Sequence, residues 1–406
     1  MSEAVEIMDS VSEQNSANET KTKKKMNKNG VWKGFFLGVL FSAVIFLIYR
    51  NVSVTGTNKE DVLKKCVEEY YLNDADEAAM QEGAYKGLIE GLGDPYSAYF
   101  TAEENSARVQ EYGGSYKGIG VVIQKDAETG MITIVNCYEG SPAEQAGIMS
   151  GDIVYLINGE TAAEKTLEEA VEIIKGSGDA GVDLTLIREG MNEYLGVNVV
   201  PNDIEYPVVS HSMLENQIGY LALTDFKESS YHQFHEALED LKSQNMRGLI
   251  VDLRNNTGGL LDSVTSILND ILPKGTIVYT VDKYGTREDY TSDGKTPLEI
   301  PMVILVNGYT ASASEIFAGA VRDYDMAKLV GTQTYGKGVV QTTIRLADGS
   351  ALKLTTANYY TPNGTNINGT GLTPDVEVEL DLTPLEDGSY YDNQLAKAQE
   401  VIEEMF

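Results

Sequence analysis

The stretch IPMVILVNGYTASASEIFAGAVRDY (residues 300–324) decides the fold of the larger part of this chain. An uninterrupted apolar run ends at Asn307-Gly308, a short polar loop follows, and a helical pattern begins at Ser312. A continuous apolar strand is typical of a sheet that is buried on both faces, and helices must cover such a sheet. The stretch therefore predicts a layered α/β domain in which Ser312 lies at the start of a helix.

Apolar strands followed by helices recur on both sides of this stretch, which extends the predicted α/β domain over residues 201–380. Strands are predicted at 217–223, 247–256, 277–281, 300–308, 327–331, 342–346 and 351–361, and helices at 229–243, 257–272 and 312–324. The remainder, residues 381–406, ends in the amphipathic pattern NQLAKAQEVIEEMF, which predicts a helix that packs or dimerises.

Residues 113–200 change character and predict a small independent β-domain with two short helices. The loop Gly118-Ile119-Gly120 enters a strand, where several backbone N–H groups can turn inward and hold a terminal carboxylate. The edge of that strand, beside the helix predicted at 166–176, suits an extended peptide that adds as a further strand. Glycines beside a strand usually only form a turn, so this interpretation depends on the whole order of elements.

The first 112 residues contain no recognisable chemistry. Residues 1–30 are polar and rich in lysine, which predicts a disordered tail, and residues 58–112 predict helices that pack or dimerise, with a capping box at Thr101 and Glu104. Between them, residues 31–50 contain an uncharged apolar run that predicts a single transmembrane anchor. The lysines before it place the N-terminus in the cytoplasm and the rest of the chain outside. A cleaved signal peptide is the alternative, but residues 51–60 contain no small-residue cleavage site.

Composition excludes several classes of function. The chain has 406 residues, with 31 Lys+Arg against 62 Asp+Glu and a net charge of −31, so binding to nucleic acid is disfavoured. Two cysteines and three histidines argue against a zinc, iron–sulfur or His-rich site, and no metal or cofactor is expected. Whether Cys66 and Cys137 pair is left open.

Three loops carry residues suited to acyl transfer. Ser312 in the first helical turn has the positive end of the dipole and free N–H groups beside it, although Ser312 with Glu315 is also an ordinary capping box. Lys337, between two glycines in TQTYGKGVVQTTI (332–344), can act as a base only if its surroundings lower its pKa from ~10.4; otherwise it is a surface lysine. In an extended strand Gln341 would lie ~13 Å from Lys337, so a contact requires a turn.

The third loop, in VDLRNNTGGLLDS (251–263), contains Gly258 and Gly259, whose N–H groups can accompany that of Ala313 in an oxyanion hole. The alternative is that these glycines only turn a strand into a helix. Asn255 and Asn256 are expected to brace this loop, and Arg254 is expected to form an ion pair.

A segment of the small β-domain resembles a PDZ domain: GSPAEQAGIMSGDIVYLING (140–159). Three motifs follow it in order: DLRNNTGG (252–259), NGYTASASEIFAGA (307–320) and GTQTYGKGVVQ (331–341). The combined pattern resembles the carboxyl-terminal processing peptidases. The resemblance covers about residues 58–380 and implies a crotonase-like or Clp-protease-like α/β core with an inserted PDZ-like domain. It also implies roles for individual residues: Ser312 as nucleophile, Lys337 as general base, Gln341 as its orienter, Ala313 with Gly258 or Gly259 as oxyanion donors, and Gly118, Ile119 and Gly120 as the peptide-binding loop. Thr310 and Thr257 depart from the family pattern where Ser and Pro are common.

The resemblance implies a serine endopeptidase that binds the C-terminal tails of proteins through its PDZ domain and cleaves them with a Ser–Lys dyad. Together with the anchor predicted at residues 31–50, it predicts a membrane-anchored, extracytoplasmic enzyme. A homodimer or larger homo-oligomer is a further expectation. A catalytically silent peptide-binding scaffold is the alternative, and an acyl-CoA enzyme is disfavoured because a PDZ-like module has no use there. Arg188 is a weak candidate for relaying peptide binding to the active site, and an ordinary surface position is the alternative.

Overall fold

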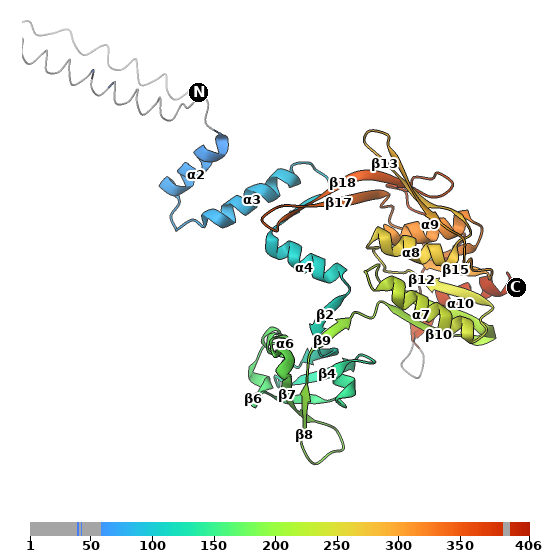
Figure 1. The fold of residues 1–406 in the computed structure, drawn as a ribbon, viewed down its shortest axis with the longest axis horizontal. Helices are drawn as coiled ribbons and strands as arrows, with labels where there is room; N and C mark the ends of the chain where they lie inside the picture. Colours follow the sequence, from blue (N-terminus) through green and yellow to red (C-terminus); the bar gives the residue numbers. More distant parts are fainter. Residues whose placement is uncertain (1–38, 40–41, 43–57, 385–389) are drawn as a thin grey trace, which may run out of the picture. The chain divides into compact units, whose positions relative to one another are not determined.

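The computed structural model describes residues 39, 42, 58–384 and 390–406 (Figure 1). The chain divides into two compact units, Met1–Met80 and Gln81–Phe406. Over the described ranges no helix combines the length and the apolar character needed to cross a bilayer. The anchor predicted for residues 31–50 lies outside the described residues, apart from Val39 and Ser42.

From residue 58 on, three helices precede the β-domain, as the sequence predicts: α2 (Lys59–Tyr70), α3 (Glu77–Glu90) and α4 (Ala102–Tyr112). The capping box of α4 is present, since Thr101 and Glu104 each accept the other's backbone N–H. Between α3 and α4 the chain also forms strand β1 (Ala98–Phe100), which the helical prediction for residues 58–112 did not include. This strand pairs antiparallel with β18 (Ala351–Tyr360). The turn before this strand is held on β18 because the Ser97 hydroxyl accepts the N–H of Thr355.

The predicted small β-domain forms as expected. Its sheet has the order β3-β4-β5-β7-β8, so β3 is an edge strand, and its buried side chains form a separate apolar core. The elements are β3 (Val121–Lys125), β4 (Ile132–Cys137), α5 (Pro142–Gln145), β5 (Ile153–Ile157), β6 (Glu160–Thr161), α6 (Leu167–Gly176), β7 (Val182–Ile187) and β8 (Leu195–Val199). A two-stranded ribbon of β2 (Ser115–Gly118) and β9 (Asn202–Glu205) lies where the chain enters and leaves this domain.

The larger domain is built on a six-stranded sheet of order β10-β11-β12-β15-β16-β19, parallel except for β10. Its central strands β12 and β15 are entirely buried, as continuous apolar runs require. The strands are β10 (Val209–Met213), β11 (Ile218–Leu223), β12 (Gly248–Asp252), β15 (Met302–Val306), β16 (Ala327–Gly331) and β19 (Val376–Glu377). This arrangement confirms the layered α/β prediction.

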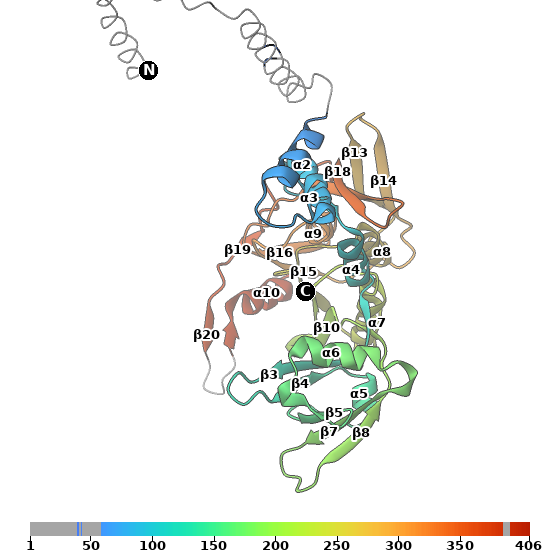
Figure 2. The same cartoon turned by 90° about the vertical axis from the view of Figure 1, so that its left-hand side faces the viewer.

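Helices cover both faces of this sheet (Figures 1 and 2). One face packs in the main core against α7 (Ser230–Ser243), α8 (Leu261–Ile271) and α9 (Ala313–Asp323). The other face packs against α10 (Asn393–Glu403), the predicted C-terminal helix. Helix α8 begins four residues later than expected, because Gly258 and Gly259 adopt positive φ angles that end the helical pattern.

A second, antiparallel sheet lies beside this core. It has the order β1-β18-β13-β14, and β17 also pairs with β18. Its further members are β13 (Gly275–Asp282), β14 (Arg287–Ser292) and β17 (Val339–Arg345). A short hairpin of β20 (Leu382–Pro384) and β21 (Tyr390–Asp392) precedes α10. Both cysteines are free thiols.

Candidate active site

Ser312 occupies the N-cap position of α9, in the loop that follows the buried strand β15. Its φ of 56° is unusual for a residue with a side chain and stores local strain. Ser314, the other serine of the motif, is fully buried and donates its hydroxyl to the Asn256 carbonyl oxygen. Only Ser312 of the two lines a cleft, of about 710 Å³. The geometry therefore favours Ser312 as the accessible hydroxyl.

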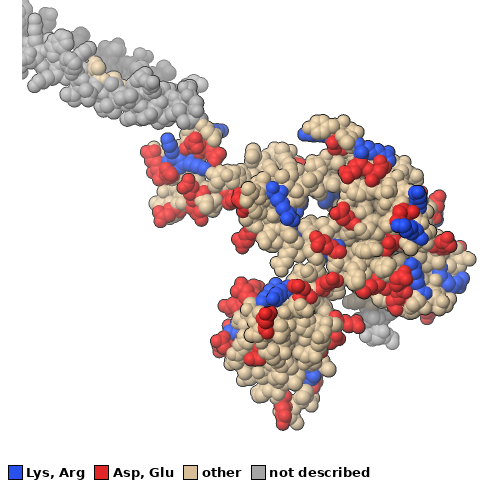
Figure 3. Space-filling view, in the orientation of Figure 1, with Lys and Arg blue, Asp and Glu red and all other residues tan. Residues whose placement is uncertain are grey.

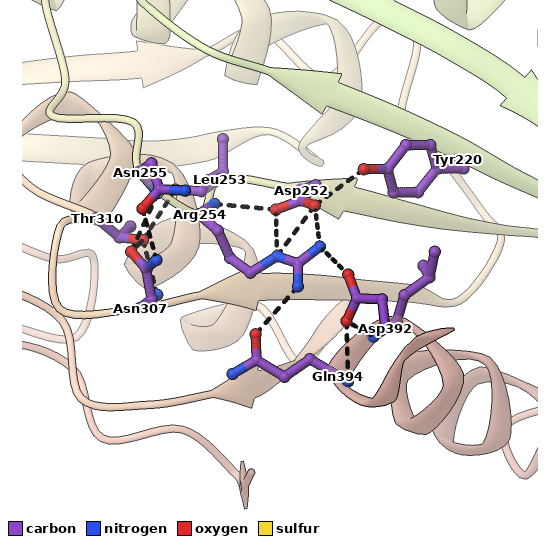
Figure 4. Close-up of polar contacts among 10 residues, drawn as sticks. Tyr220, Asp252, Leu253, Arg254, Asn255, Asn307, Thr310, Asp392 and Gln394 are labelled. Atoms are coloured by element: carbon purple, nitrogen blue, oxygen red, sulfur yellow. Dashed lines mark hydrogen bonds and ion pairs between the residues drawn. The ribbon is translucent and has the colours of Figure 1, made fainter. Parts of the chain in front are cut away.

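Polar contacts hold the loop before Ser312 in place (Figure 4). The Thr310 hydroxyl donates to the Leu253 carbonyl oxygen at 2.8 Å and accepts the N–H of Asn307 at 2.9 Å. Asn255 and Asn307 form two hydrogen bonds with each other, side chain to side chain and backbone to side chain. Thr310, at a position where the family often has serine, thus holds this loop through its hydroxyl. The expected brace by Asn255 is confirmed.

Glu315 joins the nucleophile loop to the lysine loop. Its carboxylate is fully buried and accepts four hydrogen bonds. Oε2 accepts the N–H of Ser312 and the N–H of Lys337, each at 2.9 Å, while Oε1 accepts the Thr334 hydroxyl at 2.5 Å and the N–H of Gly336 at 2.8 Å. Since one oxygen binds both, the backbone nitrogens of Ser312 and Lys337 are no more than 5.8 Å apart.

Lys337 lies in the irregular loop between β16 and β17 and lines the same cleft as Ser312. Burial lowers the pKa of its ammonium, and the positive charge of Lys353 lowers it further, against the opposing fields of Glu315 and Asp94. Its Nζ lies 4.9 Å from the centre of the Tyr96 ring. The lowered pKa is what a general-base lysine requires.

The expected oxyanion donors gather around Ser312. A Cβ on Gly258 would lie 2.8 Å from the Ser312 Cβ and 2.9 Å from the Ala313 nitrogen, so only glycine fits there. The N–H of Gly258 donates to Asn256 Oδ1 at 2.9 Å, whose amide in turn donates to the Leu223 carbonyl oxygen. Asn256 therefore braces the loop as expected. Gly259, like Gly258 and Ala313, lines the cleft.

Gln341 also lines the cleft, on β17 just after a register shift between Val340 and Gln341. Its amide donates to the Val339 carbonyl oxygen at 3.3 Å. No hydrogen bond between Gln341 and Lys337 occurs in the part of the chain that the structure describes. The structure thus brings Gln341 to the site without the contact that an orienting role requires.

The predicted peptide-binding loop forms between β2 and β3. Gly120 has a φ of 79°, and a Cβ there would come within 2.3 Å of the Ser141 Cβ, so this loop requires glycine. The carbonyl oxygens of Ile119 and Gly120 accept the N–H groups of Ala143 and Tyr138, which fixes the loop against the start of α5. Because β3 is an edge strand, its outer backbone groups can accept an added peptide strand.

Arg188 and Arg254 both form ion pairs that hold parts of the fold together. Arg188 forms a two-pronged ion pair with the buried Asp152 at 2.7 and 2.8 Å inside the small domain. Arg254, as expected, forms ion pairs: it binds Asp252 and Asp392, both through Nη2, at 2.6 and 2.8 Å (Figure 4). Asp392 also caps α10, so Arg254 joins the end of β12 to the C-terminal helix.

Sequence reasoning missed three residues of the site. Glu315 was expected only as a helix cap. A signal for its second role is that it is the one charged residue among the first nine residues of α9, whose other members are apolar or small. Tyr96 lies against Lys337 from the segment before β1, where the sequence predicted only helices. Tyr359 is almost fully buried and donates its hydroxyl to the Ser312 carbonyl oxygen at 3.2 Å; burial raises the pKa of Tyr359 well above its ordinary value.

Comparisons with known proteins agree with this architecture. The profile of peptidase family S41 matches residues 217–378, a PDZ-domain profile matches residues 133–188, and the profile of the activating protease CtpB N-terminal domain matches residues 3–104. Together with the site, these matches define a serine-type peptidase that carries a PDZ domain.

Curated relatives narrow this class. A carboxy-terminal-processing protease of Bartonella bacilliformis is 35% identical over 368 residues, which cover 86% of this chain and 82% of that protein. Carboxy-terminal processing protease CtpA of Bacillus subtilis is 34% identical over 84% of this chain and 75% of its own length. The chain belongs to the carboxy-terminal-processing protease family. A Bacteroides fragilis structure assigned to the S41 proteases shares the fold, with a TM-score of 0.50 at 18% identity over 83% of this chain and 93% of that one.

Proposed function

We propose that this peptidase cleaves with a Ser312–Lys337 dyad. The observation that supports the dyad most is the shared Glu315 oxygen, which holds the backbones of Ser312 and Lys337 together. Neutral Lys337 takes the proton from the Ser312 hydroxyl as the oxygen attacks a peptide carbonyl, and an acyl-enzyme forms. Lys337 then protonates the leaving amine, and water releases the product.

The surrounding groups complete the proposal. The N–H of Ala313, with that of Gly259, stabilises the oxyanion, since the N–H of Gly258 already donates to Asn256 Oδ1. Gln341 orients the Lys337 amine once a substrate is in place, after exchanging its present contact with Val339. In the PDZ domain, the Gly118–Gly120 loop holds the C-terminal carboxylate of a protein substrate, and the edge of β3 accepts its tail as an added strand.

The proposed location is extracytoplasmic, with residues 31–50 as a membrane anchor and a cytoplasmic N-terminus. The sequence supports this through the apolar run flanked by Lys33 and Arg50 and preceded by lysines. Fractionation of cells that express the full chain, followed by added protease on intact cells, tests it. Recovery of the full chain in the soluble fraction would contradict the anchor.

The dyad is tested with the full chain in detergent micelles and a protein substrate that ends in apolar residues. Wild type should cleave it, whereas Ser312→Ala and Lys337→Ala should not, and the exposed Ser210→Ala serves as control. Cleavage that survives Ser312→Ala would refute the assignment, and no cleavage by wild type would favour a silent scaffold. Amidation of the substrate C-terminus should raise KM if the PDZ loop binds the terminal carboxylate.

A further inference from the structure

Two cations face the active-site cleft at some distance from Ser312. Arg108 on α4 and Lys353 on β18 both line it, and both are partly buried. They share one aromatic ring: the Arg108 guanidinium carbon lies 4.5 Å and the Lys353 Nζ 5.7 Å from the centre of Phe100. Like charges are thus held close together, which is unfavourable unless an anion joins them.

Neither cation has a carboxylate partner within the described ranges, although the chain carries 62 acidic residues. The terminal nitrogens of Arg108 donate to the Thr343 hydroxyl and to Asn105 Oδ1, and its buried Nε–H has no acceptor. The field of Asp94 reaches Lys353, but Asp94 already accepts the Ser97 hydroxyl. Figure 3 shows acidic side chains scattered over the face that it draws, so the missing carboxylate beside this cation pair does not reflect a shortage of acidic residues.

The second sheet connects this pair to the nucleophile. Lys353 lies opposite Thr343, the residue that Arg108 contacts, on the paired strands β18 and β17. Lys353 and Tyr359 lie six residues apart on β18, and both line the cleft. Tyr359 contacts Ser312, and six residues of strand span ~20 Å. An extended peptide on Ser312 therefore reaches the cation pair within about six residues.

We propose that Arg108 and Lys353 form a subsite for a carboxylate of the peptide substrate, no more than about six residues from the scissile bond. The proposal rests on the proposed function, because it takes Ser312 as the point of cleavage. The guanidinium supplies a forked donor, including the Nε–H that now lacks an acceptor, and the lysine supplies a second positive charge. The subsite thus makes the peptidase selective for acidic segments near the cleaved bond.

The test uses Ser312→Ala full-length protein in detergent micelles, so that binding is measured without cleavage. Fluorescent peptides with an apolar C-terminus carry one Glu, moved through six positions on each side of the intended cleavage site, and a matched series carries Gln. We expect one position to bind about tenfold more tightly with Glu than with Gln, and the gain to fall as salt is added. Arg108→Gln or Lys353→Gln should remove this gain, and the exposed Lys328→Gln should keep it.

Two further arms make the outcome decisive. Lys353→Arg should retain the preference, which separates loss of charge from loss of folding. If Arg108 and Lys353 bind the terminal carboxylate of the peptide, amidation of the C-terminus should weaken binding to Ser312→Ala protein, and Arg108→Gln or Lys353→Gln should abolish this effect of amidation. If the PDZ domain binds the terminal carboxylate, the effect of amidation should be the same in both Gln variants. Equal binding of Glu and Gln peptides at every position, or a preference unchanged in both Gln variants, would overturn the subsite. Cleavage of the all-Gln peptide by wild-type protein tests the dyad separately.

Discussion

Glu315→Gln should disable this peptidase although the new side chain has the same shape. The amide replaces one carboxylate oxygen, and each oxygen now accepts two hydrogen bonds, so two of the four donors face an NH₂ group. A hydrogen bond to a charged group contributes ~1.5–3 kcal/mol, so the two lost bonds cost ~3–6 kcal/mol. This cost is a large fraction of the ~5–15 kcal/mol that stabilises a typical domain.

The effect is measured by urea unfolding and by the rate of cleavage of a peptide substrate, with Glu288→Gln on the exposed part of β14 as control. We expect the control to change the free energy of unfolding by less than ~0.5 kcal/mol. Glu315→Gln should lower it by at least ~3 kcal/mol and reduce kcat/KM more than about a hundredfold where the protein is still folded. A folded Glu315→Gln enzyme with near wild-type kcat/KM would refute the claim that Glu315 holds the two loops together.

Three further changes have defined outcomes. Gly258→Ala should lower the free energy of unfolding by ~2 kcal/mol and abolish cleavage, because its Cβ would lie 2.7 Å from the Ala311 carbonyl oxygen; Gly140→Ala, also at positive φ but in open space, should cost less in urea unfolding and spare cleavage. Arg254→Met should lower the free energy of unfolding by ~3–5 kcal/mol, because it leaves two partly buried carboxylates without their cation; an unchanged urea midpoint would contradict this. Lys337→Met should be inactive yet more stable than wild type near neutral pH, since burial disfavours the lysine charge. Equal free energies of unfolding for Lys337→Met and wild type at every pH from 6 to about 10 would contradict this.

The sequence predicted the parts of the fold that depend on strong periodicity. Apolar runs such as that of β15 and amphipathic patterns such as that of α7 form where they were expected. Strands β10 and β14 were missed because their residues, VSHSM and REDYTS, are mostly polar. Such strands form at sheet edges, where pairing with a neighbour rather than burial decides the conformation.

The site was predictable as a set of motifs but not as a geometry. Nothing in the spacing of Ser312 and Glu315 distinguishes an ordinary helix cap from a carboxylate that also binds the loop of Lys337, because those donors come from a different part of the chain. The pairing of Arg108 with Lys353 across one Phe100 ring likewise depends on α4 meeting β18, which local sequence does not encode. The position of Gln341 in its motif predicted that it reaches the site, but not that its amide donates to the Val339 carbonyl oxygen rather than to Lys337.

The protonation of Lys337 tests the account most directly. Its pKa is lowered in the folded protein, and only the neutral amine can accept the Ser312 proton, so acylation should accelerate as pH rises through that pKa and level off above it. The measurement is an NMR titration of the Lys337 side chain in lysine-labelled protein, assigned with Lys337→Arg, beside the pH dependence of the acylation rate. The account predicts one common midpoint below ~10.4. A Lys337 midpoint at or above that value, or an acylation rate that does not change across it, would contradict the account.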